Sequence, residues 1–154
     1  MSLANGFCEN VVNMAEIILA PSKSRGQDHD IALICNDEMV TYRQLWSRVN
    51  QAGNAFLGLE ITTGDRVVLM VRDTPAFFYV YLGLMTIGAV PIAINLRLSN
   101  ADVAYTMNDS QAKAIVLDDI FFKDYQGYIL FHRAQRYLAQ QPHPARIPLL
   151  EYTY

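Results

Sequence analysis

The chain lacks most of the features that mark secreted, metal-binding or nucleic-acid-binding proteins. Only 18% of its 154 residues are charged, and the net charge is −3 with the positive charges scattered along the chain. Proteins that bind nucleic acid usually gather lysine and arginine on one segment or face, so nucleic acid is not an expected partner. The two cysteines, Cys8 and Cys35, form no CxxC motif, and no histidines stand at metal-ligand spacing. The sequence therefore predicts neither a disulfide framework nor a metal site.

The first residues also lack a secretory signal, because no basic segment precedes an apolar core there. Low cysteine usage makes a reducing compartment the default expectation. The predicted location is therefore the cytoplasm. A chain of 154 residues can bury roughly two thirds of the surface of its unfolded form, which is enough for one domain with a real core.

Charge is absent altogether over 23 consecutive residues, at positions 74–96. An uncharged apolar run of about 18 residues or more can be a membrane-spanning helix. However, Pro75 suits the first turn of a helix, Gly88 stands where that helix would end, and residues 90–94 suit a short strand. A spanning helix would have to cross Gly88 and Pro91, and no cluster of basic residues flanks the run to set its orientation. The sequence favours a buried helix, a turn and a buried strand over a membrane span.

The other segments alternate between helix and strand signals. Thr41 and Gln44 form a capping box for a helix that stops near Gly58, and Thr74 and Ser99 are predicted caps of two later helices. Helices are expected over residues 10–20, where Pro21 ends the helix, and over 42–58, 75–87 and 100–108. Strands are expected over residues 31–35 and 39–41, which would form a hairpin, and over 66–71, 90–94 and 114–117.

From residue 66 onward the predicted order is β-α-β-α-β. Strands separated by helices of this length imply parallel pairing, right-handed crossovers and helices packed on the faces of the sheet. The predicted fold class is therefore α/β, with a mainly parallel sheet flanked by helices.

Several segments resemble one enzyme family, and they follow in that family's order. The similar segments are TYRQL at 41–45, GDRVVLM at 64–70, LGLMTIGAVPIAIN at 82–95 and DSQAKAIVLD at 109–118. They are similar to the N-terminal region of the adenylate-forming acyl- and aryl-CoA ligases, and DTPAF at 73–77 is most similar to the benzoate-CoA ligase branch. The resemblance implies that the chain is part of the large N-terminal domain of an acyl-adenylate-forming enzyme.

The similarity extends over about residues 9–119, so residues 1–119 are predicted to be an N-terminal subdomain of such a ligase. Residues 120–154 carry none of these motifs and are predicted to form a divergent, partly helical tail. Three origins remain open for this tail: a piece cut from a longer enzyme, a natural truncation, or a short protein with its own end.

For a full-length enzyme, the resemblance implies a two-step reaction that uses ATP, Mg²⁺ and coenzyme A. The acid carboxylate attacks the α-phosphate of ATP, releasing pyrophosphate, and the thiol of coenzyme A then displaces AMP. A glycine-rich loop would hold the pyrophosphate end, but no two of the eight glycines here stand closer than five residues. The later motifs of the family, including its lysine region, are absent too. We therefore expect an N-terminal fragment of a carboxylic acid (aromatic acid) CoA ligase that has no catalytic residue of its own.

Arg97 is the one candidate cofactor-binding residue. It follows the strand predicted at 90–94 and matches the position where ligases of this family can present an arginine to the nucleotide phosphate of coenzyme A. The planar guanidinium suits this task because it binds phosphate oxygens in pairs. The alternatives are a solvated loop arginine and an ion pair with Asp102.

A non-catalytic interaction module is the competing class of function. A partial domain exposes sheet edges and core faces that its missing part would cover. Such a chain is expected to pair with the remainder of the ligase or to associate with itself as a homo-oligomer.

Overall fold

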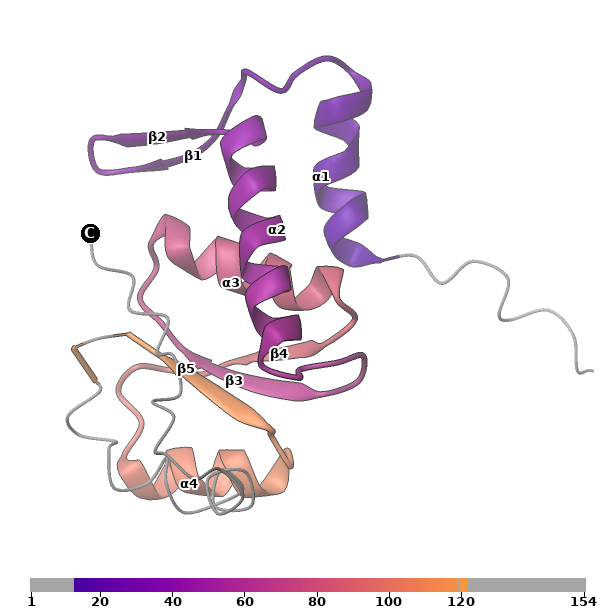
Figure 1. Cartoon of the computed structure of the whole chain (residues 1–154). Coiled ribbons are helices and arrows are strands. Elements are labelled where there is room, and N and C mark those ends of the chain that lie inside the picture. Colours follow the sequence, from indigo (N-terminus) through magenta and orange to yellow (C-terminus); the bar gives the residue numbers. More distant parts are fainter. Residues whose placement is uncertain (1–12, 119, 122–154) are drawn as a thin grey trace, which may run out of the picture.

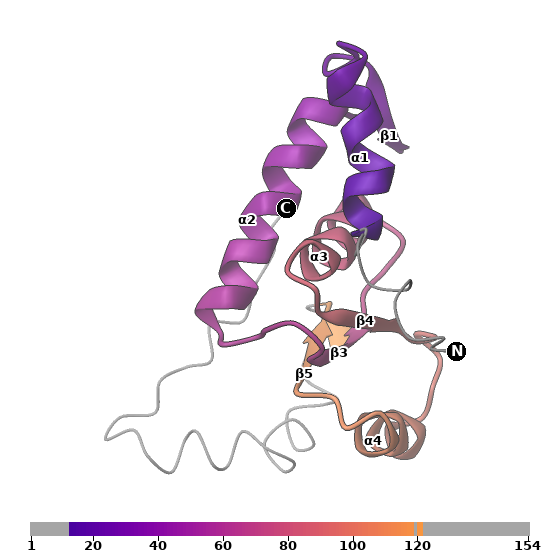
Figure 2. The same ribbon diagram turned by 90° about the vertical axis from the view of Figure 1, so that its right-hand side faces the viewer.

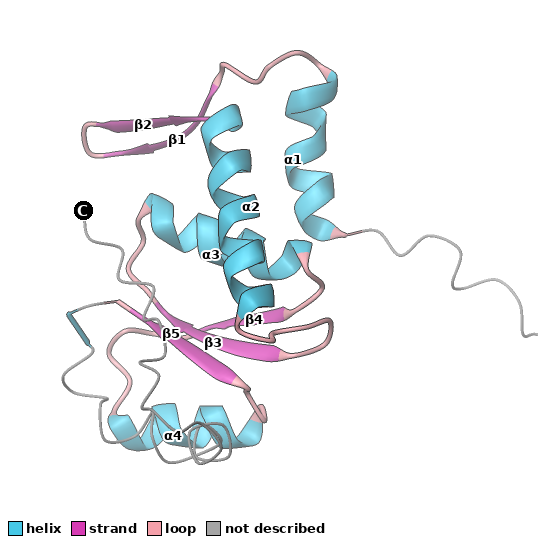
Figure 3. Cartoon of the chain, viewed as in Figure 1, coloured by secondary structure: helices cyan, strands magenta, loops and turns pink. Residues whose placement is uncertain are grey.

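The computed structural model describes residues 13–118 and 120–121 of the chain. This part contains four helices and two small sheets (Figures 1 and 3). The elements in chain order are α1 (Met14–Ser24), β1 (Ile31–Cys35), β2 (Glu38–Thr41), α2 (Tyr42–Gly58), β3 (Arg66–Met70), α3 (Pro75–Thr86), β4 (Val90–Ala93), α4 (Asn100–Asp109) and β5 (Ala114–Leu117). The predicted α/β class is confirmed. The predicted tail at 120–154 lies almost entirely outside the described residues.

α1 runs farther than the sequence predicts. The helix continues to Ser24, so the expectation that Pro21 ends it is wrong. The Leu19 carbonyl accepts a local hydrogen bond from Ser22 Oγ at 2.7 Å and a tertiary one from Trp46 Nε1 at 3.3 Å, and both support the last turns of the helix. Packing of this kind routinely overrides local propensity. The start of the helix predicted over residues 10–20 lies outside the described residues.

α2 begins where the sequence predicts. Thr41 Oγ1 accepts from the Gln44 N–H at 3.3 Å, and the Gln44 side chain accepts from the Thr41 N–H at 2.8 Å, which completes the capping box. The predicted hairpin is also present, because β1 and β2 pair antiparallel immediately before this helix. The helix buries one stripe of residues at three- and four-residue spacing: Leu45, Val49, Ala52, Gly53 and Phe56.

The uncharged stretch divides into α3, a turn and β4, as predicted. Gly88 ends the helical segment with a φ of 76°, a backbone conformation that glycine adopts without steric cost. Among the described residues, no helix is both long enough and apolar enough to cross a membrane. Thr74 stands at the N-cap, but its side chain caps nothing. Pro75 offers no N–H, and the Phe77 N–H bonds the Thr74 carbonyl at 3.0 Å instead.

The three later strands form a parallel sheet in the order β4-β3-β5, as the alternation of elements predicts. β3 is central, and residues 67–70 are almost fully buried. The strand predicted at residues 90–94 is present as β4. The prediction that this strand is buried is wrong, because it is an edge strand and Val90 is 46% exposed. β5 is the other edge of the described sheet and is only partly buried. Neither edge strand has a second neighbour among the described residues, so both retain exposure.

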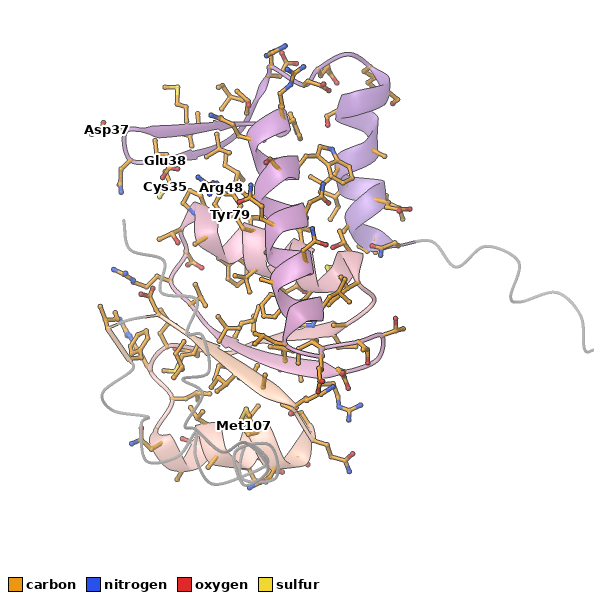
Figure 4. All side chains as sticks on the ribbon, viewed as in Figure 1. Cys35, Asp37, Glu38, Arg48, Tyr79 and Met107 are labelled. Atoms are coloured by element: carbon orange, nitrogen blue, oxygen red, sulfur yellow. The ribbon has the colours of Figure 1, made fainter. Side chains whose placement is uncertain are left out.

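Helices cover the two faces of this sheet unequally. α2 and α3 lie over one face and α4 lies under the other, as the two perpendicular views show (Figures 1 and 2). On the α2–α3 side the core is extensive, and its buried members are Ala52, Phe56, Ile61, Val67, Leu69, Val80, Leu84 and Ala89. On the α4 side the core cluster has two buried members, Met70 and Val103. Met107 points from α4 toward the strands and fills part of this thinner layer (Figure 4).

Two glycines let α2 and α3 cross in close contact. A Cβ atom on Gly83 would lie 2.8 Å from Ala52 Cβ and 3.0 Å from both the Gly53 N and the Val49 carbonyl oxygen. Two of these three neighbours are backbone atoms, which cannot move aside without shifting the helix. A Cβ on Gly53 would in turn lie 3.2 Å from the Gly83 carbonyl oxygen. The separation of the two helices therefore depends on the absence of side chains here.

Overpacking a core usually costs about 1–3 kcal/mol. Alanine also brings a gain in helix propensity of about 1 kcal/mol, so we expect Gly83→Ala to destabilise the chain by up to about 2 kcal/mol. Urea-induced unfolding followed by circular dichroism measures the difference. Gly58→Ala is the matched control, because a Cβ atom on that glycine, the last residue of α2, would meet no atom within 4 Å. A Gly83→Ala protein as stable as Gly58→Ala would contradict the close-packing argument.

Candidate functional site

The carboxyl ends of the three parallel strands meet at one edge of the sheet, on the left of Figure 1. Ligands of open α/β sheets bind outside this edge, because the loops that follow the strands are gathered there. In this chain the loops carry Arg72 after β3, Asn95 and Arg97 after β4, and Asp118 after β5. This end of the sheet, called the carboxyl edge below, is therefore the candidate site.

Arg72 and Asp118 join the loops after β3 and β5. Arg72 Nε lies 2.6 Å from Asp118 Oδ2, and Arg72 Nη2 lies 2.9 Å from Asp118 Oδ1, so the guanidinium is bound in a fork. The Asp118 side chain is 10% exposed and that of Arg72 is 41% exposed. A two-point ion pair with one buried partner holds its geometry far better than a pair on the surface. This contact keeps the two loops in register at the edge.

Arg97 occupies a turn directly after β4. Asn95 Oδ1 accepts a hydrogen bond from the Arg97 N–H at 2.8 Å, and the Asn95 carbonyl accepts from the Leu98 N–H at 3.2 Å. Asparagine side chains commonly stabilise turns in this way. The Arg97 side chain is exposed, and its guanidinium makes no ion pair with any residue that the structure describes. It can therefore meet a ligand without first breaking a contact.

The alternative ion pair between Arg97 and Asp102 does not form. The Asp102 carboxylate accepts hydrogen bonds from Ser99 Oγ at 2.6 Å and from the Ser99 N–H at 3.3 Å. Ser99 Oγ in turn accepts from the Asp102 N–H, so the two residues form the predicted cap of α4. Asp102 thus stabilises the helix that follows the loop and leaves the arginine exposed.

The described residues do not fit an ATP phosphate cradle. Such a cradle needs successive backbone N–H groups that point at one anion, usually supplied by closely spaced glycines. Gly64 and Gly88 are the two nearest the sheet with positive φ, and they lie at its opposite, amino-terminal end, where the Gly64 N–H donates to the Gly88 carbonyl at 2.9 Å. An anion at the carboxyl edge would instead meet the exposed guanidinium of Arg97.

The amino-terminal end of the sheet is closed by a charged cluster. Lys113 Nζ lies 2.7 Å from Asp65 Oδ2 and also donates to the Glu60 carbonyl. Asp65 Oδ2 accepts further hydrogen bonds from the Thr62 N–H at 2.8 Å and from Thr62 Oγ1 at 3.0 Å. The hydrogen bond from Lys113, followed by that from the Thr62 backbone, lowers the pKa of Asp65. This cluster joins the turns before β3 and β5 and so has a structural role.

Other chemically reactive side chains lie away from the candidate edge. Cys35 ends β1 in the hairpin and is a free thiol. Figure 4 shows it beside Glu38, far from α4. His29 is exposed in the loop before β1. Across the described residues, no group of three or more histidine, cysteine, aspartate or glutamate side chains could hold a metal ion.

The sequence names Arg97, whose role stays a prediction, but it does not predict the pair of Arg72 and Asp118. Asp118 directly follows β5, and its carbonyl accepts a hydrogen bond from the Phe121 N–H at 2.9 Å. The two charges stand 46 positions apart, and only the order of the strands brings them together. Arg72 and Asp118 each follow their strand closely. A sequence signal that β3 and β5 are neighbours would therefore have been enough to predict the ion pair.

Comparison with known proteins identifies a family model and several relatives. The model of the AMP-binding enzyme family matches residues 22–150. The chain is 35% identical over 115 residues to a 3-hydroxybenzoate–CoA/4-hydroxybenzoate–CoA ligase of Thauera aromatica, and 35% identical over 126 residues to a 3-hydroxybenzoate–CoA ligase of Aromatoleum sp. (strain CIB). These matches cover 75% and 82% of this chain. The chain spans only 22% and 24% of the length of the two relatives.

Solved structures share the same fold. A benzoate CoA ligase from Burkholderia xenovorans LB400 superposes with a TM-score of 0.70 at 24% identity, over 75% of this chain and 23% of that one. The anthranilate CoA ligase AuaEII in complex with anthranoyl-AMP gives a TM-score of 0.68 at 26% identity, again over 75% and 23%. The family match extends beyond residue 119, and the division of the chain at that position stays a prediction.

The lowered pKa of Asp65 predicts how stability changes with pH. Because the pKa is lower in the folded chain than in the unfolded one, the charged pair stabilises the fold in full above the ordinary aspartate pKa of about 3.9 and less as the pH falls below it. We expect Asp65→Asn to be less stable than the wild type at neutral pH, with the difference shrinking in acid. Urea unfolding between neutral pH and pH 3 measures this. In a Lys113→Met background, the stability difference between the Asp65 and Asp65→Asn forms should change much less with pH. A stability difference that grows in acid would contradict the lowered pKa of Asp65.

Proposed function

The chain belongs to the AMP-binding enzyme family, and we propose that it is the N-terminal part of an ATP-dependent ligase that joins an aromatic carboxylic acid to coenzyme A. Its similarity to two hydroxybenzoate–CoA ligases is the observation that carries this proposal. Since the chain spans less than a quarter of either relative, the activity is proposed for an enzyme that includes the remaining part. The role proposed for this chain is to provide scaffold and a contact for coenzyme A.

Arg97 is the proposed contact for the nucleotide phosphate of coenzyme A. Three features of the structure support this role: the residue directly follows a parallel strand, its loop is held by Asn95, and its guanidinium is exposed. A guanidinium can bind two phosphate oxygens at once, and a loop fixed by a side-chain hydrogen bond loses less entropy when it binds. Arg72 is less suited to the role because Asp118 already occupies its fork.

ATP and Mg²⁺ are proposed as cofactors of the complete enzyme, in which Mg²⁺ would neutralise phosphate charge. The described residues supply neither a phosphate cradle nor a group of metal ligands. What they supply is a rigid edge of the sheet, with loops held by the pair of Arg72 and Asp118 and by the cap at Ser99. Such supports keep a binding loop in position and so favour ligand binding.

A second candidate function is a non-catalytic module that binds itself or a separate ligase half. The observation that favours it is a set of large apolar side chains that are half exposed or more, on α1 and on the hairpin. They are Met14, Ile17, Ile18, Ile34 and Met39. Large apolar side chains left exposed can take part in an interface with another chain. Light scattering separates the two candidates, because a chain that stays monomeric at high concentration does not act by self-association.

We expect Arg97→Ala to weaken the binding of coenzyme A about tenfold, since charge-assisted hydrogen bonds contribute about 1.5–3 kcal/mol. Isothermal titration of the chain with coenzyme A and with dephospho-coenzyme A measures the effect. Only the ligand that carries the nucleotide phosphate should respond to the substitution. Arg25→Ala is the matched control, because Arg25 is an exposed arginine in the turn after α1. Equal affinities of the wild type and Arg97→Ala for coenzyme A would remove the proposed contact.

The chain alone is expected not to adenylate an acid, because residues 13–118 supply no phosphate cradle. In an assay with ATP, Mg²⁺ and 3-hydroxybenzoate, pyrophosphate release should stay at the level of a blank without protein. The Thauera aromatica ligase serves as the positive control. Acid-dependent pyrophosphate release by the chain would show that its own residues bind and activate ATP.

A further inference from the structure

The loop after β4 alternates between anchored and exposed residues. Its apolar side chains are partly buried and pack against the core cluster on the α4 side; they are Ile94, Leu96 and Leu98. The two residues between them, Asn95 and Arg97, are exposed. Buried side chains on one side of a segment hold its backbone in place, because moving them would expose apolar surface to water. The loop therefore presents Asn95 and Arg97 together on its outer side, at the carboxyl edge.

One hydrogen bond fixes how the Asn95 carboxamide is oriented. The Arg97 N–H can only donate, so the atom that accepts from it at 2.8 Å is the carboxamide oxygen, Oδ1. The other terminal atom, Nδ2, carries two N–H donors. Nδ2 makes no hydrogen bond with any residue in the described part of the chain. Asn95 thus offers two uncommitted donors beside the backbone of Arg97.

The charges around this loop favour an anion. Arg97 is the first charged residue after Asp73, and the next acidic residue is Asp102. The N-terminus of α4 would by itself attract an anion as well, through its helix dipole. However, the Asp102 carboxylate already lies in the first turn of that helix and accepts from Ser99 Oγ at 2.6 Å. An anion is therefore expected at Arg97 and Asn95 rather than at the end of the helix.

We infer that Asn95 Nδ2 is a second donor to the phosphate group that Arg97 binds. This inference rests on the proposed function, in which that group is the nucleotide phosphate of coenzyme A. A phosphate monoester has three terminal acceptor oxygens, so it can accept from the guanidinium and from the carboxamide at once. Arg97 supplies the charge. Asn95 supplies a neutral donor whose position is fixed before the ligand arrives, which reduces the entropy lost on binding.

A role limited to holding the turn is the alternative for Asn95. In that case only Oδ1 would matter, because Oδ1 accepts from the Arg97 N–H. Aspartate has nearly the same shape and keeps this acceptor, but its ionised side chain has no donor. Asn95→Asp therefore separates the two roles, because it preserves the turn and removes the proposed donor. Asn95→Ala removes both.

The direct test observes the Asn95 side chain by NMR in the full 154-residue chain. The isotope-labelled chain is titrated with coenzyme A and, separately, with dephospho-coenzyme A. We expect the Nδ2 protons to shift in resonance and to exchange with water more slowly when coenzyme A binds. Dephospho-coenzyme A should leave them unchanged, because it lacks the nucleotide phosphate. Nδ2 resonances that respond to neither ligand, or equally to both, would overturn the inference.

Isothermal titration of the variants gives a second test. A hydrogen bond to a charged group can change affinity about tenfold, so we expect Asn95→Ala and Asn95→Asp each to weaken coenzyme A binding by at least that factor. Ala101→Asp is the matched control for charge, because it adds a carboxylate at an exposed position of α4 and removes no side-chain donor. Its effect should stay below about threefold. Wild-type affinity in Asn95→Asp, or equal losses in Asn95→Asp and Ala101→Asp, would contradict the inference.

The outcome is separable from that of the proposed Arg97 contact. If Arg97→Ala weakens coenzyme A binding while Asn95→Asp does not, the contact stands and the second donor fails. If neither substitution changes the affinity, the contact and the second donor both fail.

Discussion

The close crossing of α2 and α3 is the contact on which the rest of the described structure depends. Gly53 and Gly83 bring the two backbones together, so that α3 can lie between the sheet below it and α2 above it. α3 then contributes side chains to two hydrophobic cores. Tyr79 and Leu82 pack with α1 and the hairpin, whereas Val80 and Leu84 pack with the strands. α1 is tied to the end of the same helix, because the Asn13 side-chain amide donates to the Met85 carbonyl at 2.8 Å. A wider separation of α2 and α3 would disturb both cores at once.

The sheet held beneath these helices has two ends with different tasks. At its amino-terminal end, Asp65 accepts from Lys113 and Thr62 and joins the turns before β3 and β5. In that cluster the charges are already engaged in structural contacts, which a ligand would have to break. At the carboxyl end, the pair of Arg72 and Asp118 supports the loops, and Arg97 stays exposed beside them. One end is therefore built for stability, and the other combines support with an available charge.

From the sequence, a candidate site residue could be named only where a single position was sufficient. Arg97 could be named because it directly follows a strand signal and matches a family position. Arg72 and Asp118 could not be paired, because their contact depends on strand order, which local patterns do not encode. The side-chain cap expected at Thr74 is missing for a local reason. The Phe77 N–H, one of the amides that an N-cap side chain can bind, donates to the Thr74 carbonyl at 3.0 Å.

The sequence by itself determined the elements, their order and the parallel α/β class. Capping boxes, apolar spacing and punctuation by glycine and proline act over a few residues, so they can be recognised without a structure. Tertiary structure alone decided which strands became edges and how far α1 continued past Pro21. It also decided which charges met. These outcomes depend on contacts between residues far apart in the chain, whose energies exceed local preferences and leave little trace in the local sequence.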